Sequence, residues 1–234
     1  WCVSLTSITI PDSVTSIGED AFYSCDSLTS VSIGDNVTSI GKDAFSSTPI
    51  LSNQTTDVKY VDKWIIGCNN GVTSVTIKSG TKGIADNAFY GCTGLTSVKI
   101  PNSVTSIGAY AFEDCKNLTS VEIPDSVEAI GENTFSSCTS LTSIEIPHSV
   151  TTIGIEAFSD CTNLTNIEIP NSVTMIDIDA FSYCDNIKSV ILGDSVTVIG
   201  DEAFYYCSSL TNIVIPDSVT TIGDYAFEYC SSLT

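Results

Sequence analysis

The ten cysteines are the residues with the most obvious chemistry in this chain of 234 residues, since a thiol can form a disulfide or ligate a metal ion. Seven of them recur every 23 residues, from Cys92 to Cys230, and Cys2, Cys25 and Cys68 fall at or next to the same position of the pattern. Such a series predicts buried free thiols that act as small apolar side chains. Disulfides and a metal site are weaker alternatives, because parallel side chains pair awkwardly and no C-x-x-C motif occurs.

Carboxylates are the second group that could do chemistry. Glu122, Glu145 and Glu168 occupy the same position in successive repeats, about 5 Å apart if the repeats stack as strands. Retaining glycosidases use two carboxylates at such a distance, but the environments of the two must differ, and these three are equivalent. The only histidine, His148, has no nucleophile in a distinctive context. We therefore predict no catalytic residue, no metal site and no cofactor; divalent-cation binding by the acidic surface is a weaker alternative.

A 23-residue repeat must position these side chains, and residues 118–140, LTSVEIPDSVEAIGENTFSSCTS, are a representative copy. Its first part, L-x-x-I-x-I, ends at a proline and alternates apolar and polar residues, which predicts a short strand. The V-T-x-I segment predicts a second, shorter strand, and the glycine after it predicts a sharp change of direction. The A-F-x-x-C segment follows a group of acidic residues, and this order predicts one helical turn per repeat.

A fixed repeat of this length is typical of a solenoid. One copy cannot enclose a core, whereas stacked copies place each inward Leu, Ile, Val, Phe and Cys against its equivalent in the next coil. We therefore predict a single solenoid over residues 1–234. Residues 51–71 break the pattern and lack the A-F element, which predicts an irregular coil that stays stacked in the solenoid, with room for a small hairpin and with a turn at residues 69–71.

The pattern L-x-x-I-x-I-P…I-G-x-x-A-F-x-x-C resembles the BspA-like leucine-rich repeats, which are 23-residue repeats of bacterial and protist surface proteins. The resemblance covers nearly the whole chain. It implies a curved solenoid with a parallel sheet on one face, a secreted or cell-surface location, and a role in adhesion or binding. The predicted fold is therefore a leucine-rich-repeat solenoid, a right-handed coil with one parallel β-sheet face, a second short strand and a helical turn per repeat.

The composition restricts the partners. The chain carries 28 acidic and 8 basic residues, a net charge of −20, so it lacks the basic stripes that bind nucleic acid or anionic membranes. It has no apolar run of membrane-spanning length, and it begins and ends within a repeat, without polar caps, as a fragment of a longer protein would. We expect a non-enzymatic extracellular or cell-surface module that binds a protein or glycan, of a host or of the extracellular matrix for example. A rigid structural spacer that presents another domain is the alternative.

The candidate binding residues lie where the chain departs from uniform repetition. The outward position between the two strand isoleucines forms a stripe along the sheet. Stacked like charges beside exposed apolar residues are unusual for a surface that binds nothing. The simpler interpretation is a solvated surface on which these residues are tolerated. Aromatic residues gather in the irregular coil, either as core or as an exposed recognition patch. The predicted binding residues are Lys99, Glu122, Glu145, Glu168, Ile191, Val214, Tyr60 and Trp64.

Overall fold

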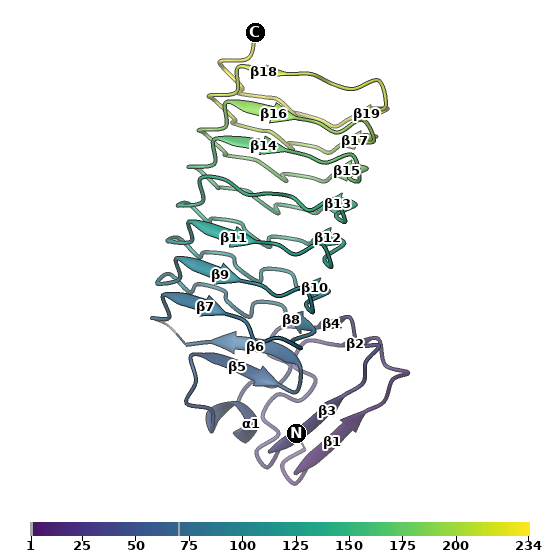
Figure 1. The fold of residues 1–234 in the computed structure, drawn as a ribbon, viewed down its shortest axis with the longest axis vertical. Helices are drawn as coiled ribbons and strands as arrows, with labels where there is room; N and C mark the ends of the chain where they lie inside the picture. Colours follow the sequence, from purple (N-terminus) through teal and green to yellow (C-terminus); the bar gives the residue numbers. More distant parts are fainter. Residues whose placement is uncertain (1, 70) are drawn as a thin grey trace.

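The computed structural model describes residues 2–69 and 71–234, and it confirms the predicted solenoid. Coils of 23 residues stack on one another, and a parallel strand ladder lies on one face of the stack (Figure 1). The register is set by the repeat, since Val98 pairs with Val75 on one side and with Val121 on the other. Each coil therefore meets the next one through equivalent residues.

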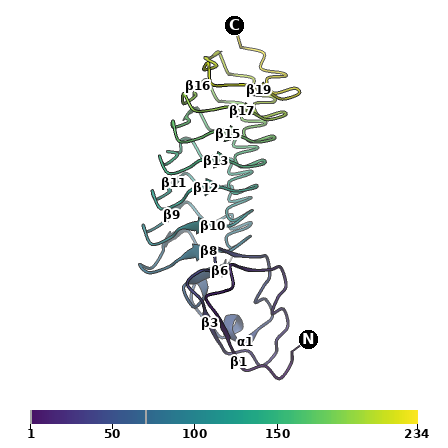
Figure 2. The same cartoon turned by 90° about the vertical axis from the view of Figure 1, so that its right-hand side faces the viewer.

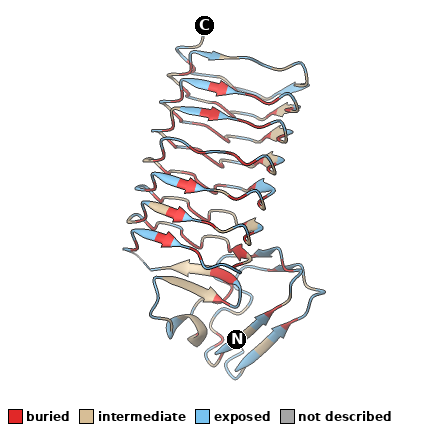
Figure 3. Cartoon of the chain, viewed as in Figure 1, coloured by how far each residue is buried: buried red, intermediate tan, exposed pale blue. Residues whose placement is uncertain are grey.

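The first strand of the repeat forms where the L-x-x-I-x-I pattern predicts it. Its copies make three parallel sheets in the orders β1-β3, β7-β9-β11 and β14-β16-β18. In the three-residue copies the central residue is buried and the residue after it is exposed, which is the alternation of a half-buried strand (Figure 3). The strands are β1 (Ser7–Ile10), β3 (Ser30–Ile33), β7 (Ser74–Thr76), β9 (Ser97–Lys99), β11 (Ser120–Glu122), β14 (Asn166–Glu168), β16 (Ser189–Ile191) and β18 (Asn212–Ile213).

The V-T-x-I segment forms the predicted second strand, which is only two residues long and lies on another side of the stack (Figures 1 and 2). These strands pair in parallel in the orders β2-β4 and β12-β13-β15-β17-β19. Two further copies, β8 and β10, pair with each other, and β8 also pairs with the irregular coil. They are β2 (Ser16–Ile17), β4 (Ser39–Ile40), β8 (Gly83–Ile84), β10 (Ser106–Ile107), β12 (Ala129–Ile130), β13 (Thr152–Ile153), β15 (Met175–Ile176), β17 (Val198–Ile199) and β19 (Thr221–Ile222).

The A-F-x-x-C segment forms consecutive turns, so the predicted helical turn in each repeat is wrong. Two residues of each copy have a left-handed backbone, for example Asp179 (φ 55°) and Tyr183 (φ 56°), and a right-handed helix cannot continue through either. Alternate amides bond instead to the next coil, as Phe181 does to the Ala203 carbonyl oxygen at 2.8 Å. An acidic residue directly before the alanine, such as Asp43 or Asp179, thus stands at a left-handed position, which Asp tolerates better than most side chains, and does not start a helix.

Helix α1 (Pro49–Ser52) leads into the irregular coil. The coil contains an antiparallel hairpin of β5 (Val58–Val61) and β6 (Trp64–Cys68), which confirms the predicted hairpin. Strand β6 pairs in parallel with β8, giving the sheet order β5-β6-β8-β10. The hairpin therefore takes the place of a regular coil in this ladder. Asn70, in the predicted turn at residues 69–71, lies outside the described residues.

The core is a set of columns built from equivalent side chains. Successive rings from Phe89 to Phe204 are fully buried, with centroids 5.0–5.5 Å apart and interplanar angles of 3–9°. The irregular coil interrupts this column, because it lacks the A-F element. The buried residues accordingly form two clusters, and β6 contributes Trp64 to the N-terminal one and Ile65 to the C-terminal one.

The cysteines form a column too, with one exception to the prediction. Cys68 and Cys92 are joined by a disulfide, so the expectation of free thiols is wrong for this pair. That expectation assumed parallel side chains in equivalent turns, and Cys68 instead lies at the end of β6. Elsewhere the thiols are free, and Cys115 donates a hydrogen bond to the Phe89 carbonyl oxygen at 3.1 Å in an arrangement that later coils repeat. Burial raises the pKa of Cys115 to about 12, so the thiol stays protonated at neutral pH.

The phenylalanine column predicts how mutational cost depends on position. Phe158→Ala should destabilise the protein by about 3–5 kcal/mol, because the ring is fully buried between two others and its removal leaves a cavity. Phe22→Ala is the matched control, because that ring is half-buried and stacks on one neighbour only. Urea unfolding followed by circular dichroism measures both losses. Equal losses would contradict the columnar core.

The cysteine arrangement predicts a thiol count. Eight cysteines should react with iodoacetamide when the chain is unfolded without a reductant, and ten after reduction, because two are held in the disulfide. Intact mass spectrometry counts the added groups. Ten modified cysteines in the unreduced, unfolded chain would show that Cys68 and Cys92 are not joined.

Candidate functional site

The outward positions of the first strand form a continuous stripe on the sheet face. Lys99 is the ladder partner of Glu122, and Glu168 is the partner of Ile191. All six predicted residues of this stripe, from Lys99 to Val214, are exposed. Ile191 stays 58% exposed although a coil lies on each side of it, so stacking does not cover this apolar side chain.

The sheet is interrupted in the middle of this stripe. Residues 143–145 form no strand, and no described residue of a neighbouring coil pairs with them in a ladder. The two missing ladders are those that would place Glu145 directly beside Glu122 and Glu168. The ladders that place Lys99 between Thr76 and Glu122 are intact. Because like charges opposite each other destabilise a sheet, we infer that repulsion among the three glutamates disfavours strand pairing here.

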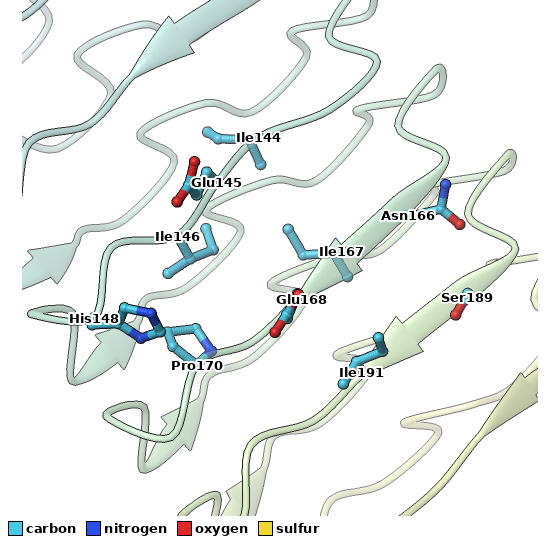
Figure 4. A pocket seen from close by; sticks show the side chains of 10 residues that line it. All are labelled: Ile144, Glu145, Ile146, His148, Asn166, Ile167, Glu168, Pro170, Ser189 and Ile191. Carbon is cyan, nitrogen blue, oxygen red and sulfur yellow. The ribbon is translucent and has the colours of Figure 1, made fainter.

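Two adjoining depressions flank the interrupted strand. One, of about 480 Å³, has Glu145, Glu168 and Ile191 in its lining, and Figure 4 shows these side chains on three neighbouring coils. The other, of about 600 Å³, has Glu122 and Glu145 in its lining. Ile144 lines both of them. Together they make a groove with carboxylates at its surface and apolar side chains in its walls, which we call the acidic groove.

His148 belongs to the acidic groove, although its sequence position gave it no role. It lines the smaller depression together with Pro170 (Figure 4). It occupies the position after the proline, which other repeats fill with Asp or Asn, for example Asp125 and Asn171. That departure is the signal that could have pointed to it. An imidazole there adds a group that can donate or accept a hydrogen bond beside Glu145 and Glu168.

The other predicted residues lie outside the two depressions. Lys99 and Val214 extend the stripe on either side, and they line neither depression. Tyr60 is half-buried, and the Lys78 ammonium lies 4.5 Å from the centroid of its ring. Trp64 is 1% exposed and packs against Gly83 of the paired strand, so it is a core residue with no surface to offer a partner. This burial corrects the view of Trp64 as part of an exposed patch.

The acidic groove presents both hydrogen-bonding groups and apolar side chains. Its carboxylates and imidazole can accept hydrogen bonds from cationic or amide groups, and its isoleucines can cover apolar surface. Among residues 2–69 and 71–234, no three His, Cys, Asp or Glu side chains are arranged to hold a metal ion. No helix in the described part of the chain has the length and apolar character to span a membrane.

Comparison with known proteins identifies the repeat. A family model described as the BspA type leucine rich repeat region, in six copies, matches residues 1–117, 66–177 and 105–234. The chain belongs to the BspA-type leucine-rich repeat family. The resemblance seen in the sequence is thereby confirmed. No curated protein sequence matches the chain.

Several solved structures are similar to this BspA-type chain. The leucine rich repeat protein of T. pallidum is 32% identical, with 73% of this chain and 82% of that chain covered and a TM-score of 0.67. A leucine rich cell surface protein of Faecalibacterium prausnitzii is 30% identical, with 98% and 78% covered and a TM-score of 0.49. A leucine-rich repeat protein of Eubacterium ventriosum, 24% identical over 98% and 84% of the two chains, has a TM-score of 0.52 and shows the shared fold.

Charge reversal at the centre of the groove should restore the missing ladders. Glu145→Lys is expected to stabilise the protein by about 1 kcal/mol, because residue 145 would then attract Glu122 and Glu168 instead of repelling them. Lys99 and Glu122 already form such an oppositely charged pair. Hydrogen exchange should slow at the amides of residues 143–146. Thermal unfolding and exchange mass spectrometry measure the two effects.

Glu128→Lys is the control, since this exposed glutamate has Thr105 and Thr151 at the equivalent positions of the adjacent coils. Equal stabilisation by both lysines would show that reducing the net charge alone is responsible.

Proposed function

We propose that this protein is a non-catalytic, extracellular or cell-surface recognition module that binds a protein or glycan partner through the acidic groove. The proposal includes the surface location, which the repeat family implies. Lys99 and Val214 flank the groove on the same face and would extend the contact along the sheet. The hairpin with Tyr60 is a secondary contact region under this proposal.

The proposal is supported by three deviations from the regular repeat that occur at one place on the surface. Three stacked glutamates, the interrupted strand at residues 143–145 and the exposed Ile191 all border the same groove. A carboxylate stack gives up ladder hydrogen bonds, each worth about 1 kcal/mol net, so it reduces the stability of the coil stack. A surface whose sole task is solubility would not need that loss, whereas a binding site gains from accessible acceptors.

The nature of the groove restricts its partner. Carboxylates concentrated around Glu145 favour a partner that presents cationic or donor-rich groups, and Ile191 favours apolar contact next to them. A protein segment with basic and apolar residues satisfies both conditions, and a glycan rich in hydroxyl groups satisfies the first. The spacer alternative requires neither.

The test is a binding screen with a defined variant. The wild-type protein should bind at least one member of an array of extracellular-matrix proteins, cell-surface proteins and glycans. Binding to that member should weaken at least about tenfold in Glu122→Ser/Glu145→Ser/Glu168→Ser, because the groove loses its acceptors. Biolayer interferometry measures both affinities. Serine occurs at the same position in the N-terminal part, as Ser32, so the fold should tolerate it.

Two controls make the result decisive. Glu128→Ser removes one charge outside the groove and should leave the affinity unchanged, whereas Glu145→Ser should lower it. Ile191→Ser should also weaken binding, because it removes the apolar end of the same surface. Unchanged affinity in the triple variant would refute recognition by the groove and would favour the spacer.

A further inference from the structure

A second departure from the repeat lies on the turn segments of the C-terminal coils, away from the first-strand sheet. Four tyrosine rings form one cluster there. Tyr183 and Tyr206 stack with centroids 5.5 Å apart, and Tyr206 and Tyr229 lie 4.8 Å apart. Tyr205 lies 5.4–5.5 Å from all three of the others. We call these four residues the tyrosine cluster.

Stacking of the coils does not bury the cluster. Tyr183 is 42% exposed and Tyr206 is 40% exposed, although each has a coil on either side. The phenylalanines of the same turn segments, Phe181 and Phe204, are fully buried in the core column. The core is therefore complete without the tyrosines, and their rings and hydroxyl groups face outward.

The backbone at this position makes tyrosine an unfavourable choice. Tyr183, Tyr206 and Tyr229 have φ angles of 56°, 59° and 59°, in the left-handed region that bulky side chains rarely adopt. The other coils place small or short polar residues in the same slot: Ser24, Ser47, Gly91, Asp114, Ser137 and Asp160. Three consecutive tyrosines thus stand where the fold favours smaller side chains, and burial gives no compensation. Residues held in sparsely populated backbone regions cluster at functional sites, and here such residues are exposed aromatics.

Carboxylates adjoin the cluster in the sequence. Glu202 lies three residues before Tyr205, and Glu228 directly precedes Tyr229. Desolvation, the neighbouring tyrosines and these two carboxylates raise the pKa of Tyr205. The chain as a whole has a net charge of −20. An acidic partner would be repelled at this surface, and a basic one attracted.

We propose that the tyrosine cluster is an interaction surface for a protein segment that carries exposed Arg or Lys side chains. The tyrosine hydroxyls and the carboxylates of Glu202 and Glu228 accept hydrogen bonds from guanidinium or ammonium groups. The rings pack against the apolar stems of these long side chains. Tyrosine supplies much contact area with little loss of conformational freedom, which explains its enrichment at protein interfaces. The surface is distinct from the acidic groove.

The test compares two sets of tyrosines on the same edge of the solenoid. The probe is a short unstructured peptide in which Arg alternates with Gly. Tyr183→Ser/Tyr206→Ser/Tyr229→Ser should bind it at least about tenfold more weakly than the wild type, because the ring contacts are lost while the charge is unchanged. Tyr23→Ser/Tyr90→Ser removes two exposed tyrosines that lie outside the cluster and should change the affinity less than about twofold.

The fold should survive the triple substitution, because Ser occupies the equivalent left-handed slot at Ser24, Ser47 and Ser137. Circular dichroism and thermal unfolding verify this. Equal peptide binding by all three proteins would overturn the proposal, since charge alone would then attract the peptide. Selective loss of binding to neutral oligosaccharides, or of self-association in sedimentation velocity, would also overturn it, because the cluster would then serve a glycan or a second copy.

Discussion

Equivalence between neighbouring coils is the constraint on which this structure depends. Amides of the turn segments bond to the next coil, as Phe181 does to Ala203, and the rings of Phe158 and Phe181 stack in the same direction. Neither interaction exists within one coil, so a single repeat has little to hold it in shape. Stability therefore comes from matching slots 23 residues apart, and the largest buried slot keeps its side chain along the stack, as the rings from Phe89 to Phe204 do.

The same constraint amplifies changes at outward slots. A single unusual residue at an outward position has little effect on the stack. When neighbouring coils repeat it, the copies form a column, since equivalent positions lie about one strand spacing apart. Three glutamates in one slot coincide with the interrupted strand at residues 143–145, and three tyrosines in another make a continuous aromatic surface. Both proposed interaction surfaces thus arise from repetition of an unusual residue, which a solenoid can introduce without disturbing its core.

The hairpin shows how the stack accommodates a coil that does not match. Strand β6 replaces the second strand of a regular repeat, and its adjacent residues Trp64 and Ile65 enter different core clusters. Gly83 leaves room for the indole, because a side chain there would collide with the ring. The hairpin consequently joins the two parts of the core where the phenylalanine column is interrupted.

The sequence by itself determined the 23-residue register, both strands of the repeat, the hairpin and the inward columns, because each is encoded by local periodicity in contact with its own copy. It did not determine the left-handed turns, since Gly-x-x-Ala-Phe also fits a helical turn and only the amide bonds between coils favour the alternative. The Cys68–Cys92 bridge, the burial of Trp64 and the place of His148 in the acidic groove were likewise decided by the tertiary structure. Each depends on the path of the chain at the irregular coil or on contacts between coils. Residues distant in the sequence meet there, and the repeat period does not predict which ones.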